Sequence, residues 1–388
     1  MEYFLSDRER AAVETAREFA EKYIRPVRAE YDEKGIFPWD IVRAMGRADL
    51  CGVYIPEEYG GLGLGVFGLC LIVEEMSKVC GGITLAMAAT GLGTFPLLLY
   101  GNKEQKEKYL PRIARGELLC AFGLTEANAG SDAGSIKTKA DKDGDYFVLN
   151  GTKTWITNGE VAGLYTVIAV TDKSKGARGT TAFLVEKGTP GFSFGRREEK
   201  MGIRASSTTE LVFENCRVHK SQILAREGMG FIVAMNTLCN SRPGVAAQAL
   251  GIGAGALDEA MAFAKERKQF GSPIVSFQAI QHMLADMATE VEAARALLYQ
   301  TARMIDSKKQ KNFSKESAMA KVFCSDVAMR TAVNAVQILG GSGYMKEFPA
   351  EKMMRDAKIT QIYEGTNQIC RNEIALQLIK ESAGKSRA

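Results

Sequence analysis

The spacing of apolar residues changes twice along this chain, and each change predicts a change of secondary structure. From Asp7 to about Gly116, apolar residues recur every three or four positions, as on one face of an α-helix. From about residue 120 to about residue 225, short apolar runs are separated by Gly, Pro and Asn, which is typical of strands joined by turns. Helical spacing then returns and continues toward the C-terminus.

These three parts are long enough to be separate domains, because the chain has 388 residues and is 46% apolar. We expect an α+β protein with an all-helical N-terminal domain over 1–120. A small antiparallel, barrel-like β domain should follow over 121–225. In the last part, 226–388, long helical patterns joined by short loops favour an antiparallel four-helix bundle.

Turn residues in the middle part predict where its strands begin and end. Asp143-Gly144 indicates a turn, and Asn150-Gly151 is a strong signal for a two-residue hairpin. Further apolar runs separated by turn residues are expected to be strands, namely 164–170, 180–185 and 210–213.

In the C-terminal part, Pro243 suits the first turn of a helix, because proline has no N–H and a fixed φ. We expect this helix to stop near Phe270-Gly271, with the glycine at its C-terminal cap. Two long amphipathic helices should follow, over 276–305 and 317–339.

One stretch, 79–102, contains no charged residue and is long enough to span a bilayer. It also holds several glycines and Pro96, and amphipathic segments flank it. We therefore expect a buried helix that lines an apolar cavity, with no membrane insertion. The N-terminus has neither a signal h-region nor an Arg-rich transit segment, and none of the eight cysteines falls in a C-x-x-C pair. A cytoplasmic protein is expected.

Charge and histidine content disfavour other classes of function. The net charge of +4 comes without any run of five basic residues, so nucleic-acid binding is not expected. His219 and His282 are the only histidines, which disfavours His-based metal sites and Ser-His-Asp triads. No metal site is predicted.

Several polar motifs are candidates for a ligand site, and each has a structural alternative. Glu364 lies between an apolar stretch and a Gly-Thr-Asn turn, which can aim its carboxylate into a cavity; the alternative is a solvated surface residue. The segment 123–132 can bring N–H groups and hydroxyls to a ligand, or can be a polar turn. The segment 155–159 places an aromatic ring beside a hydroxyl, or packs in the core.

Two further motifs lie at predicted helix ends. Arg267, shortly before Gln278, either complements the end of its helix or pairs with a phosphate. The segment 337–344 has three glycines in four positions, more than a helix cap needs, which suggests close approach of the backbone to a ligand. No G-x-G-x-x-G motif follows a strand, so a Rossmann site is not expected.

Taken together, these segments resemble the acyl-CoA dehydrogenase family of flavoproteins, from residue 1 to about residue 380. The resemblance is strongest with the short-chain, butyryl-CoA branch. It implies the acyl-CoA dehydrogenase fold and a homotetramer built as a dimer of dimers. The segments that carry it are 124–132, 201–208, 244–251, 337–344 and 355–357, with Pro349 before the last.

The resemblance implies that FAD lies between the β domain and the helical bundle. The hydroxyl of Thr157 would point toward the reactive nitrogen of the flavin, and a neighbouring subunit would help to hold the pyrophosphate and adenine. The implied FAD-binding residues are Phe122, Leu124, Thr125, Gly130, Ser131, Trp155, Ile156, Thr157, Arg267, Phe270, Gln278, Gln337, Ile338, Leu339, Gly340, Gly341, Thr366, Asn367 and Gln368.

The same resemblance implies that Glu364 is the catalytic base. It would remove a proton from the carbon next to a thioester carbonyl while a hydride leaves the following carbon. The implied reaction converts a short-chain acyl-CoA to the trans-2-enoyl-CoA in fatty-acid β-oxidation and passes electrons to electron-transfer flavoprotein. The implied substrate-binding residues are Ser131, Arg242, Tyr363 and Gly365.

Some branches of the family carry the base just before the arginine that is Arg242 here. That position is Ser241, so Glu364 has no rival there. The stretch 82–94 contains no cation, which favours an uncharged acyl chain. A branched or cyclic acyl-CoA substrate, an oxidase and a non-catalytic binding protein remain alternatives.

Two residues depart from the family pattern. Ala127 replaces the usual proline of the flavin loop, which implies a looser loop. Cys239 stands where short-chain relatives usually have Asp, which puts one polar contact to CoA in doubt and could mark a different substrate.

Overall fold

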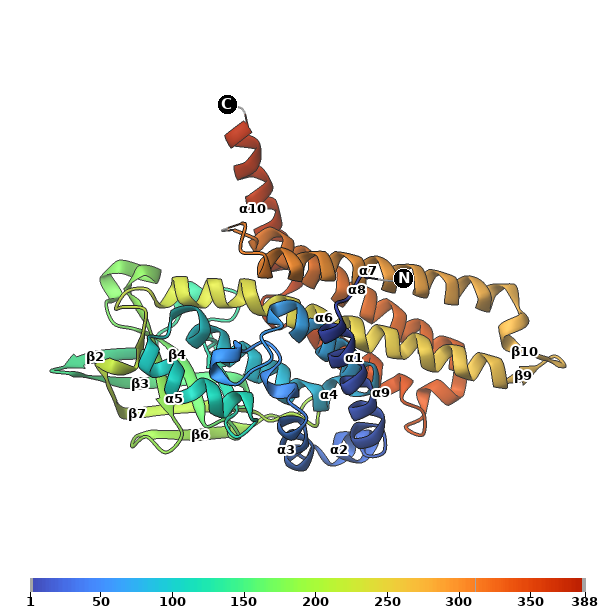
Figure 1. Cartoon of the computed structure of the whole chain (residues 1–388), viewed down its shortest axis with the longest axis horizontal. Coiled ribbons are helices and arrows are strands. Elements are labelled where there is room, and N and C mark those ends of the chain that lie inside the picture. Colours follow the sequence, from blue (N-terminus) through green and yellow to red (C-terminus); the bar gives the residue numbers. More distant parts are fainter. Residues whose placement is uncertain (1–2, 311, 386–388) are drawn as a thin grey trace.

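The computed structural model describes residues 3–310 and 312–385, in three parts (Figure 1). The β-sheet lies at one end, the N-terminal helices lie near the middle, and the long C-terminal helices run to the other end. The expected order of helical, β and helical parts is confirmed. The residues at which one domain gives way to the next stay a prediction.

Two helices of the N-terminal part begin with reciprocal side-chain caps. At the first, Ser6 Oγ accepts a hydrogen bond from the Glu9 N–H, and the Glu9 carboxylate accepts one from the Ser6 N–H. At the last of these helices, Asn102 Oδ1 accepts from the Gln105 N–H, and Gln105 Oε1 accepts from the Asn102 N–H. The helices are α1 (Asp7–Phe19) with its π-helical extension η1 (Ala20–Ile24), α2 (Arg28–Lys34), α3 (Trp39–Arg47), α4 (Gly65–Tyr100) and α5 (Lys103–Ala114).

The middle part is one sheet with the strand order β6-β7-β3-β2-β4-β5-β8, and β1 pairs with β4. Most pairings are antiparallel, as expected, but β4 runs parallel to both β1 and β2. The strands are β1 (Cys120–Gly123), β2 (Lys139–Asp143), β3 (Tyr146–Thr157), β4 (Leu164–Val170), β5 (Thr180–Glu186), β6 (Phe192–Arg197), β7 (Thr208–His219) and β8 (Ile223–Leu224).

The hairpin predicted at Asn150-Gly151 is wrong, because β3 runs through this dipeptide without turning. The chain turns instead at the predicted Asp143-Gly144 turn, between β2 and β3. At Gly151 a Cβ atom would lie 2.7 Å from Thr138 Cα, and the β3–β7 register shifts beside it. The glycine is therefore needed for close approach of a neighbouring chain segment at a bulge.

The C-terminal part is a bundle of long helices, as predicted. α10 leaves the bundle and projects away from it (Figure 1). The elements are α6 (Gly230–Glu266), the short strands β9 (Lys268–Gln269) and β10 (Ser272–Pro273), α7 (Gln278–Asp306), α8 (Ser314–Leu339), the 3-10 helix η8 (Gly340–Tyr344), α9 (Ala350–Thr360) and α10 (Asn367–Lys385).

The prediction that Pro243 begins a helix is also wrong, because Pro243 lies inside α6, which begins at Gly230. The same helix ends at Glu266, before the predicted stop. A proline inside a helix leaves the carbonyl four residues earlier without its usual donor. Here Ser317 Oγ on α8 donates to the Cys239 carbonyl oxygen at 2.7 Å, so a neighbouring helix satisfies it.

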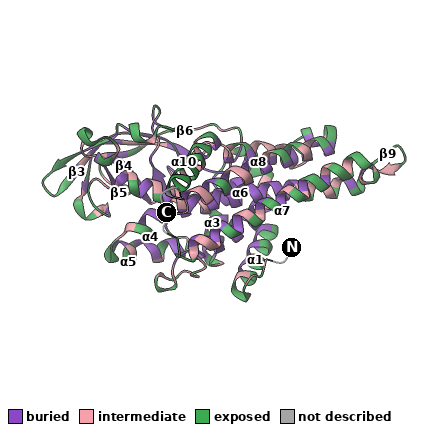
Figure 2. Cartoon of the chain, turned by 90° about the horizontal axis from the view of Figure 1, so that it is seen from above, coloured by how far each residue is buried: buried purple, intermediate pink, exposed green. Residues whose placement is uncertain are grey.

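Helix α4 contains the uncharged stretch and is long and apolar enough to cross a membrane by length and composition alone. Of its most apolar window, 78% is buried inside the protein, as predicted for a core helix. Figure 2 shows the buried residues concentrated where α4 and α6 run through the centre. The backbone of α4 is non-helical at Cys80 (φ −160°), so the helix bends there.

Two glycines allow α6 to pack directly on the backbone of α4. A Cβ atom at Gly251 would overlap the carbonyl oxygen of Glu74, and one at Gly255 would overlap that of Lys78. The two glycines are one turn apart and lie on the same face of α6. This close contact fixes the spacing of the two helices that carry one wall of the cavity described below.

We predict that Gly255→Ala lowers the free energy of unfolding by about 1–3 kcal/mol, because the added methyl group forces two backbones apart. Gly244→Ala is the matched control on the same helix, since a Cβ atom there meets only Leu69 Cδ2 at 3.8 Å. It should leave stability unchanged or raised. Thermal unfolding of both variants checks this; equal melting temperatures would contradict the close-contact account.

Candidate active site

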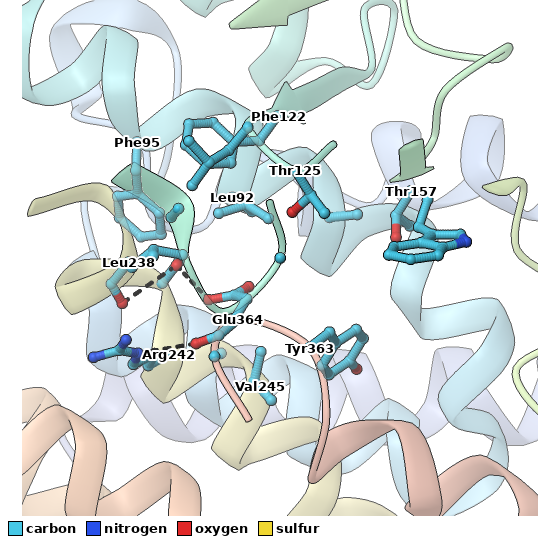
Figure 3. Close-up of a pocket in the computed structure, with 18 of the residues that line it drawn as sticks. Leu92, Phe95, Phe122, Thr125, Thr157, Leu238, Arg242, Val245, Tyr363 and Glu364 are labelled. Carbon is cyan, nitrogen blue, oxygen red and sulfur yellow. Dashed lines mark hydrogen bonds between the residues drawn. The ribbon is translucent and has the colours of Figure 1, made fainter. Parts of the chain in front are cut away.

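A cavity of about 410 Å³ opens where α4, α6, the β-sheet and the loop between α9 and α10 meet (Figure 3). α4 and α6 supply mostly apolar side chains, and the sheet supplies hydroxyls and an indole. Figure 3 shows Phe95 and Leu238 on one side of the Glu364 carboxylate and Thr157 on the other, with Leu92 facing the carboxylate across the cavity. The cavity thus has an apolar end and a polar end, with one carboxylate between them.

The Glu364 carboxylate reaches the cavity because its loop has an unusual backbone. Glu364 has φ +50° and Gly365 has φ +94°, so two consecutive residues are left-handed. A non-glycine residue in this region is strained and persists only where its surroundings hold it. A Cβ atom at Gly365 would lie 3.2 Å from Arg242 Nη2, so glycine also makes room for the arginine.

Two consecutive residues of α6 hold Glu364 from one side. Ser241 Oγ donates to Glu364 Oε2 at 2.5 Å, and Arg242 Nε donates to the Glu364 carbonyl oxygen at 3.1 Å (Figure 3). Burial raises the pKa of Glu364 from 4.5 to about 7, although Ser241, Arg242 and Lys321 all favour its charged form. A carboxylate with a pKa near neutrality is suited to general base catalysis at physiological pH.

The backbone N–H of Glu364 makes no hydrogen bond within the described residues. The neighbouring Tyr363 hydroxyl donates to Gln248 Oε1 on α6, and Gln248 Nε2 donates to the Gly81 carbonyl oxygen on α4 at 2.9 Å. This chain of hydrogen bonds ties the loop to both helices of the cavity wall. Because the Tyr363 hydroxyl is bonded to Gln248, the part of Tyr363 that can contact a ligand in the cavity is its aromatic ring.

The polar end of the cavity has the features that a planar heteroaromatic ring with a polar edge requires. In the described part of the chain, the hydroxyls of Thr125, Ser131 and Thr157 make no hydrogen bond, although all three line the cavity. The Trp155 indole beside them is 57% exposed, and Trp155 has φ +58°. A Cβ atom at Gly130 would meet nothing within 4 Å. These residues fit the isoalloxazine of a flavin.

A buried ion pair fixes the loop that follows β1. Lys153 on β3 is fully buried and donates to Glu126 Oε1 at 2.8 Å and to the Leu124 carbonyl oxygen at 3.1 Å. Glu126 also accepts hydrogen bonds from the N–H groups of Lys137 and Thr138. These bonds hold the loop without help from a proline at position 127.

The structure brings one group of predicted site residues together in this cavity. Its members come from the sheet, α6 and the Glu364 loop, and they are Phe122, Leu124, Thr125, Gly130, Ser131, Trp155, Ile156, Thr157, Arg242, Tyr363, Glu364 and Gly365. The other predicted residues do not line it: Arg267, Phe270, Gln278, Gln337, Ile338, Leu339, Gly340, Gly341, Thr366, Asn367 and Gln368.

Most of this second group lies at the far end of the bundle. Arg267, the residue after α6, is about 38 Å from Arg242 along the helix, at roughly 1.5 Å per residue. Phe270, between β9 and β10, is 95% exposed and left-handed (φ +52°). A single chain therefore does not unite the two groups. Asn367 is different: it is buried and bonded to Ser325 and Asp326.

Sequence reasoning missed three contributors to the site. Lys321 on α8 donates to the Gly365 carbonyl oxygen at 2.8 Å, Gln248 holds Tyr363, and Ser241 bonds to the carboxylate itself. The sequence signal that could have indicated Lys321 is its position among small and apolar residues on the buried face of α8. Cys239 does not line this cavity but an adjacent one with Tyr100.

Three domain profiles of the acyl-CoA dehydrogenase family match the chain in order. The N-terminal domain profile matches residues 6–117, the middle domain profile 121–216 and the C-terminal domain profile 228–379. The chain belongs to the acyl-CoA dehydrogenase family. It is an oxidoreductase, and the family is FAD-dependent.

Individual relatives are similar to this chain over nearly the whole length of both proteins. The probable acyl-CoA dehydrogenase FadE25 of Mycobacterium tuberculosis is 48% identical over 94% of this chain and 93% of its own. Butyryl-CoA dehydrogenase from Megasphaera elsdenii superposes with a TM-score of 0.94 at 45% identity, covering 98% of this chain and 100% of its own. A chain in a structure of the electron transferring flavoprotein of Acidaminococcus fermentans superposes with a TM-score of 0.95 at 50% identity. The match covers 97% of this chain and 99% of that chain.

We predict that Ser241→Ala moves the acid limb of kcat/KM to higher pH by about one unit, because a hydrogen bond to a charged group is lost. With Glu364 as the predicted base, the limb reports the pKa of Glu364 in the free enzyme, because a base must be deprotonated to act. Without the serine the carboxylate is less stable, so its pKa rises above about 7.

The matched control is Thr237→Val, which removes a buried hydroxyl without a hydrogen-bond partner one turn earlier on α6. Its pH profile should match that of the unaltered protein. Profiles from pH 5.5 to 9.5 check both variants. An acid limb that stays in place in Ser241→Ala would contradict the role given to the hydroxyl.

Proposed function

We propose that the protein catalyses the α,β-dehydrogenation of a short-chain acyl-CoA to the trans-2-enoyl-CoA, with Glu364 as the base. The observation that carries this proposal is the Glu364 carboxylate, which has a pKa of about 7 and stands between an apolar pocket and the flavin-fitting loops. A proton next to a thioester carbonyl is weakly acidic, so its removal needs a base that is free of water and held in place.

The chain supplies a donor for the thioester carbonyl as well as a base. The Glu364 N–H has no hydrogen-bond partner in the described residues and lies beside the carboxylate. It can donate to the carbonyl oxygen as negative charge develops there, which is the arrangement of an oxyanion hole. Arg242 donates to the carbonyl oxygen of the same residue at 3.1 Å, which fixes the backbone on the other side of the Glu364 Cα atom.

FAD supplies the acceptor for the two electrons that leave with the hydride. Its ring would be held by Thr125, Ser131, Trp155 and Thr157. In our proposal the distant group around Arg267 and Phe270 holds the rest of the cofactor of a second copy. The 95% exposure of Phe270 supports this reading, because an aromatic ring left in water is suited to a contact between subunits. A tetramer is part of the same proposal.

The proposed substrate carries an uncharged, short acyl chain. The apolar side chains that line the cavity include Leu85, Leu92, Phe95, Met235, Leu238 and Val245. Among the described residues that line the cavity, the cation is Arg242, whose Nε is directed at a backbone carbonyl. A cavity of about 410 Å³ that must also admit a flavin ring leaves room for few carbons.

We also propose electron-transfer flavoprotein as the acceptor and the cytoplasm as the location. The likeness to a chain in a structure of an electron transferring flavoprotein supports the first. The cysteines support the second, because none of the eight is in a disulfide in the structure.

We predict that Glu364→Gln retains yellow flavin and binds butyryl-CoA but loses turnover by several orders of magnitude, because the amide cannot accept the proton. In the unaltered protein, anaerobic butyryl-CoA should bleach the flavin absorbance. The variant should keep its colour under the same conditions. Near-normal bleaching of the variant would refute the base, and rapid recolouring of the bleached protein in air would identify an oxidase.

We predict that Phe95→Ala raises kcat/KM for hexanoyl-CoA relative to butyryl-CoA by about tenfold, since a pocket discriminates each methylene by about 1–3 kcal/mol. Phe95 is buried at the apolar end of the cavity. The matched control is Leu99→Ala, about one turn further along α4 and outside this cavity. A panel of acyl-CoA esters checks both variants; an unchanged ratio in Phe95→Ala would contradict the orientation of the acyl chain.

A further inference from the structure

Helix α8 buries a row of polar residues where its amphipathic pattern calls for apolar ones. Ser317, Lys321 and Ser325 are spaced four residues apart and are each 0% exposed. At this spacing they lie on one face of the helix. We call these three residues the polar stripe of α8. Buried polar groups persist only where they are hydrogen-bonded, so their partners indicate what the stripe does.

Every partner of the stripe outside α8 belongs to the framework around Glu364. Ser317 Oγ donates to the Cys239 carbonyl oxygen, two residues before Ser241. Lys321 Nζ donates to the Gly365 carbonyl oxygen and to Asn367 Oδ1, both at 2.8 Å. Ser325 Oγ accepts from Asn367 Nδ2 at 2.9 Å. One helix face therefore contacts both the segment of α6 around Pro243 and the loop that carries the base.

Lys321 is the unusual member, because it forms no ion pair within the described residues although its side chain is fully buried. A buried cation without a carboxylate partner is unfavourable for folding and needs another reason to persist. Burial lowers the pKa of Lys321 to about 8, with Glu364 and Cys370 favouring its charged form. It therefore carries a positive charge at pH 7.

We propose that Lys321 is a positioning residue for catalysis, which fixes the left-handed Glu364-Gly365 backbone and favours the charged carboxylate. Its two hydrogen bonds fall on the residue after Glu364 and on the first residue of α10. Both bonds hold the chain directly after Glu364, where the strained backbone leads into α10, so the orientation of the carboxylate depends on them. Lys321 does not line the cavity and so does not touch the substrate. This inference rests on the proposed role of Glu364.

The pH dependence has a defined sign. The charged groups that face Lys321 are Glu364, Arg242 and Asp326, and the thiol of Cys370 lies beside it. Those that favour the charged form of Glu364 are Arg242 and Lys321. Replacing Lys321 by a neutral residue removes one of these two cations. The base then needs a higher pH to be deprotonated, and the acid limb of kcat/KM moves upward.

The test compares Lys321→Met with Lys321→Arg in the flavin-loaded protein. We expect kcat of Lys321→Met to fall about 10- to 100-fold, since small displacements of a catalytic group have effects of this size. Its KM should stay within about threefold of normal, and its acid limb should rise. Lys321→Arg keeps the charge, so its acid limb should stay in place even if kcat falls.

Thr331→Val is the matched control, because Thr331 is also fully buried on α8 and its hydroxyl has no partner. It should leave kcat and the acid limb unchanged. If Lys321→Met does not fold, Lys321→Gln keeps an N–H donor and lacks the charge, and it should show the same upward shift. An unshifted acid limb in the neutral variant that folds would overturn the proposal.

Glu364→Gln, assayed alongside, separates two kinds of failure. If it is inactive while Lys321→Met behaves normally, the positioning role is refuted and Glu364 remains the base. If Glu364→Gln turns over normally, the base assignment is refuted and the role of Lys321 is refuted with it.

Discussion

A carboxylate withdrawn from bulk water into a mostly apolar cavity is the constraint on which the rest of this structure depends. Burial raises the pKa of Glu364 to about 7, and a residue with φ +50° has to be held in that conformation. Neither condition can be met by the loop alone. Ser241 and Arg242 hold it from α6, and Lys321 holds it from α8. Segments as far apart in sequence as Ser241 and Glu364 thus converge on one loop.

The two helices that support the site, α6 and α4, each contain an irregular residue near it. α6 contains Pro243 in its interior, next to the two residues that contact Glu364, and its free carbonyl at Cys239 is satisfied by Ser317. α4 bends at Cys80 before it lines the cavity. On the sheet side, the loop after β1 is fixed by the buried pair of Lys153 and Glu126. Local irregularities of this kind are common at functional sites.

Periodicity predicted the architecture well, because helical and strand spacing are local properties. It failed at two positions where tertiary contacts override local preference. Asn150-Gly151 lies inside strand β3 and forms no hairpin turn, and Pro243 lies inside α6 and does not begin it. Family resemblance pointed to the residues that meet around Glu364, since their motifs are local too. It did not reveal Lys321, because a helical pattern identifies a buried face without naming its partner. Arg267 was also predicted to bind the cofactor, but within a single chain it does not line the cavity.

Direct titration of the Glu364 carboxyl group tests the account most sharply. Infrared difference spectra of the protein labelled with ¹³C at glutamate carboxyls, with Glu364→Gln as the reference, isolate the C=O band of this group across pH. We expect a protonated band that disappears with a midpoint near pH 7, the pKa that burial gives this residue. A midpoint near 4.5, the ordinary value, would show a solvated carboxylate and contradict it.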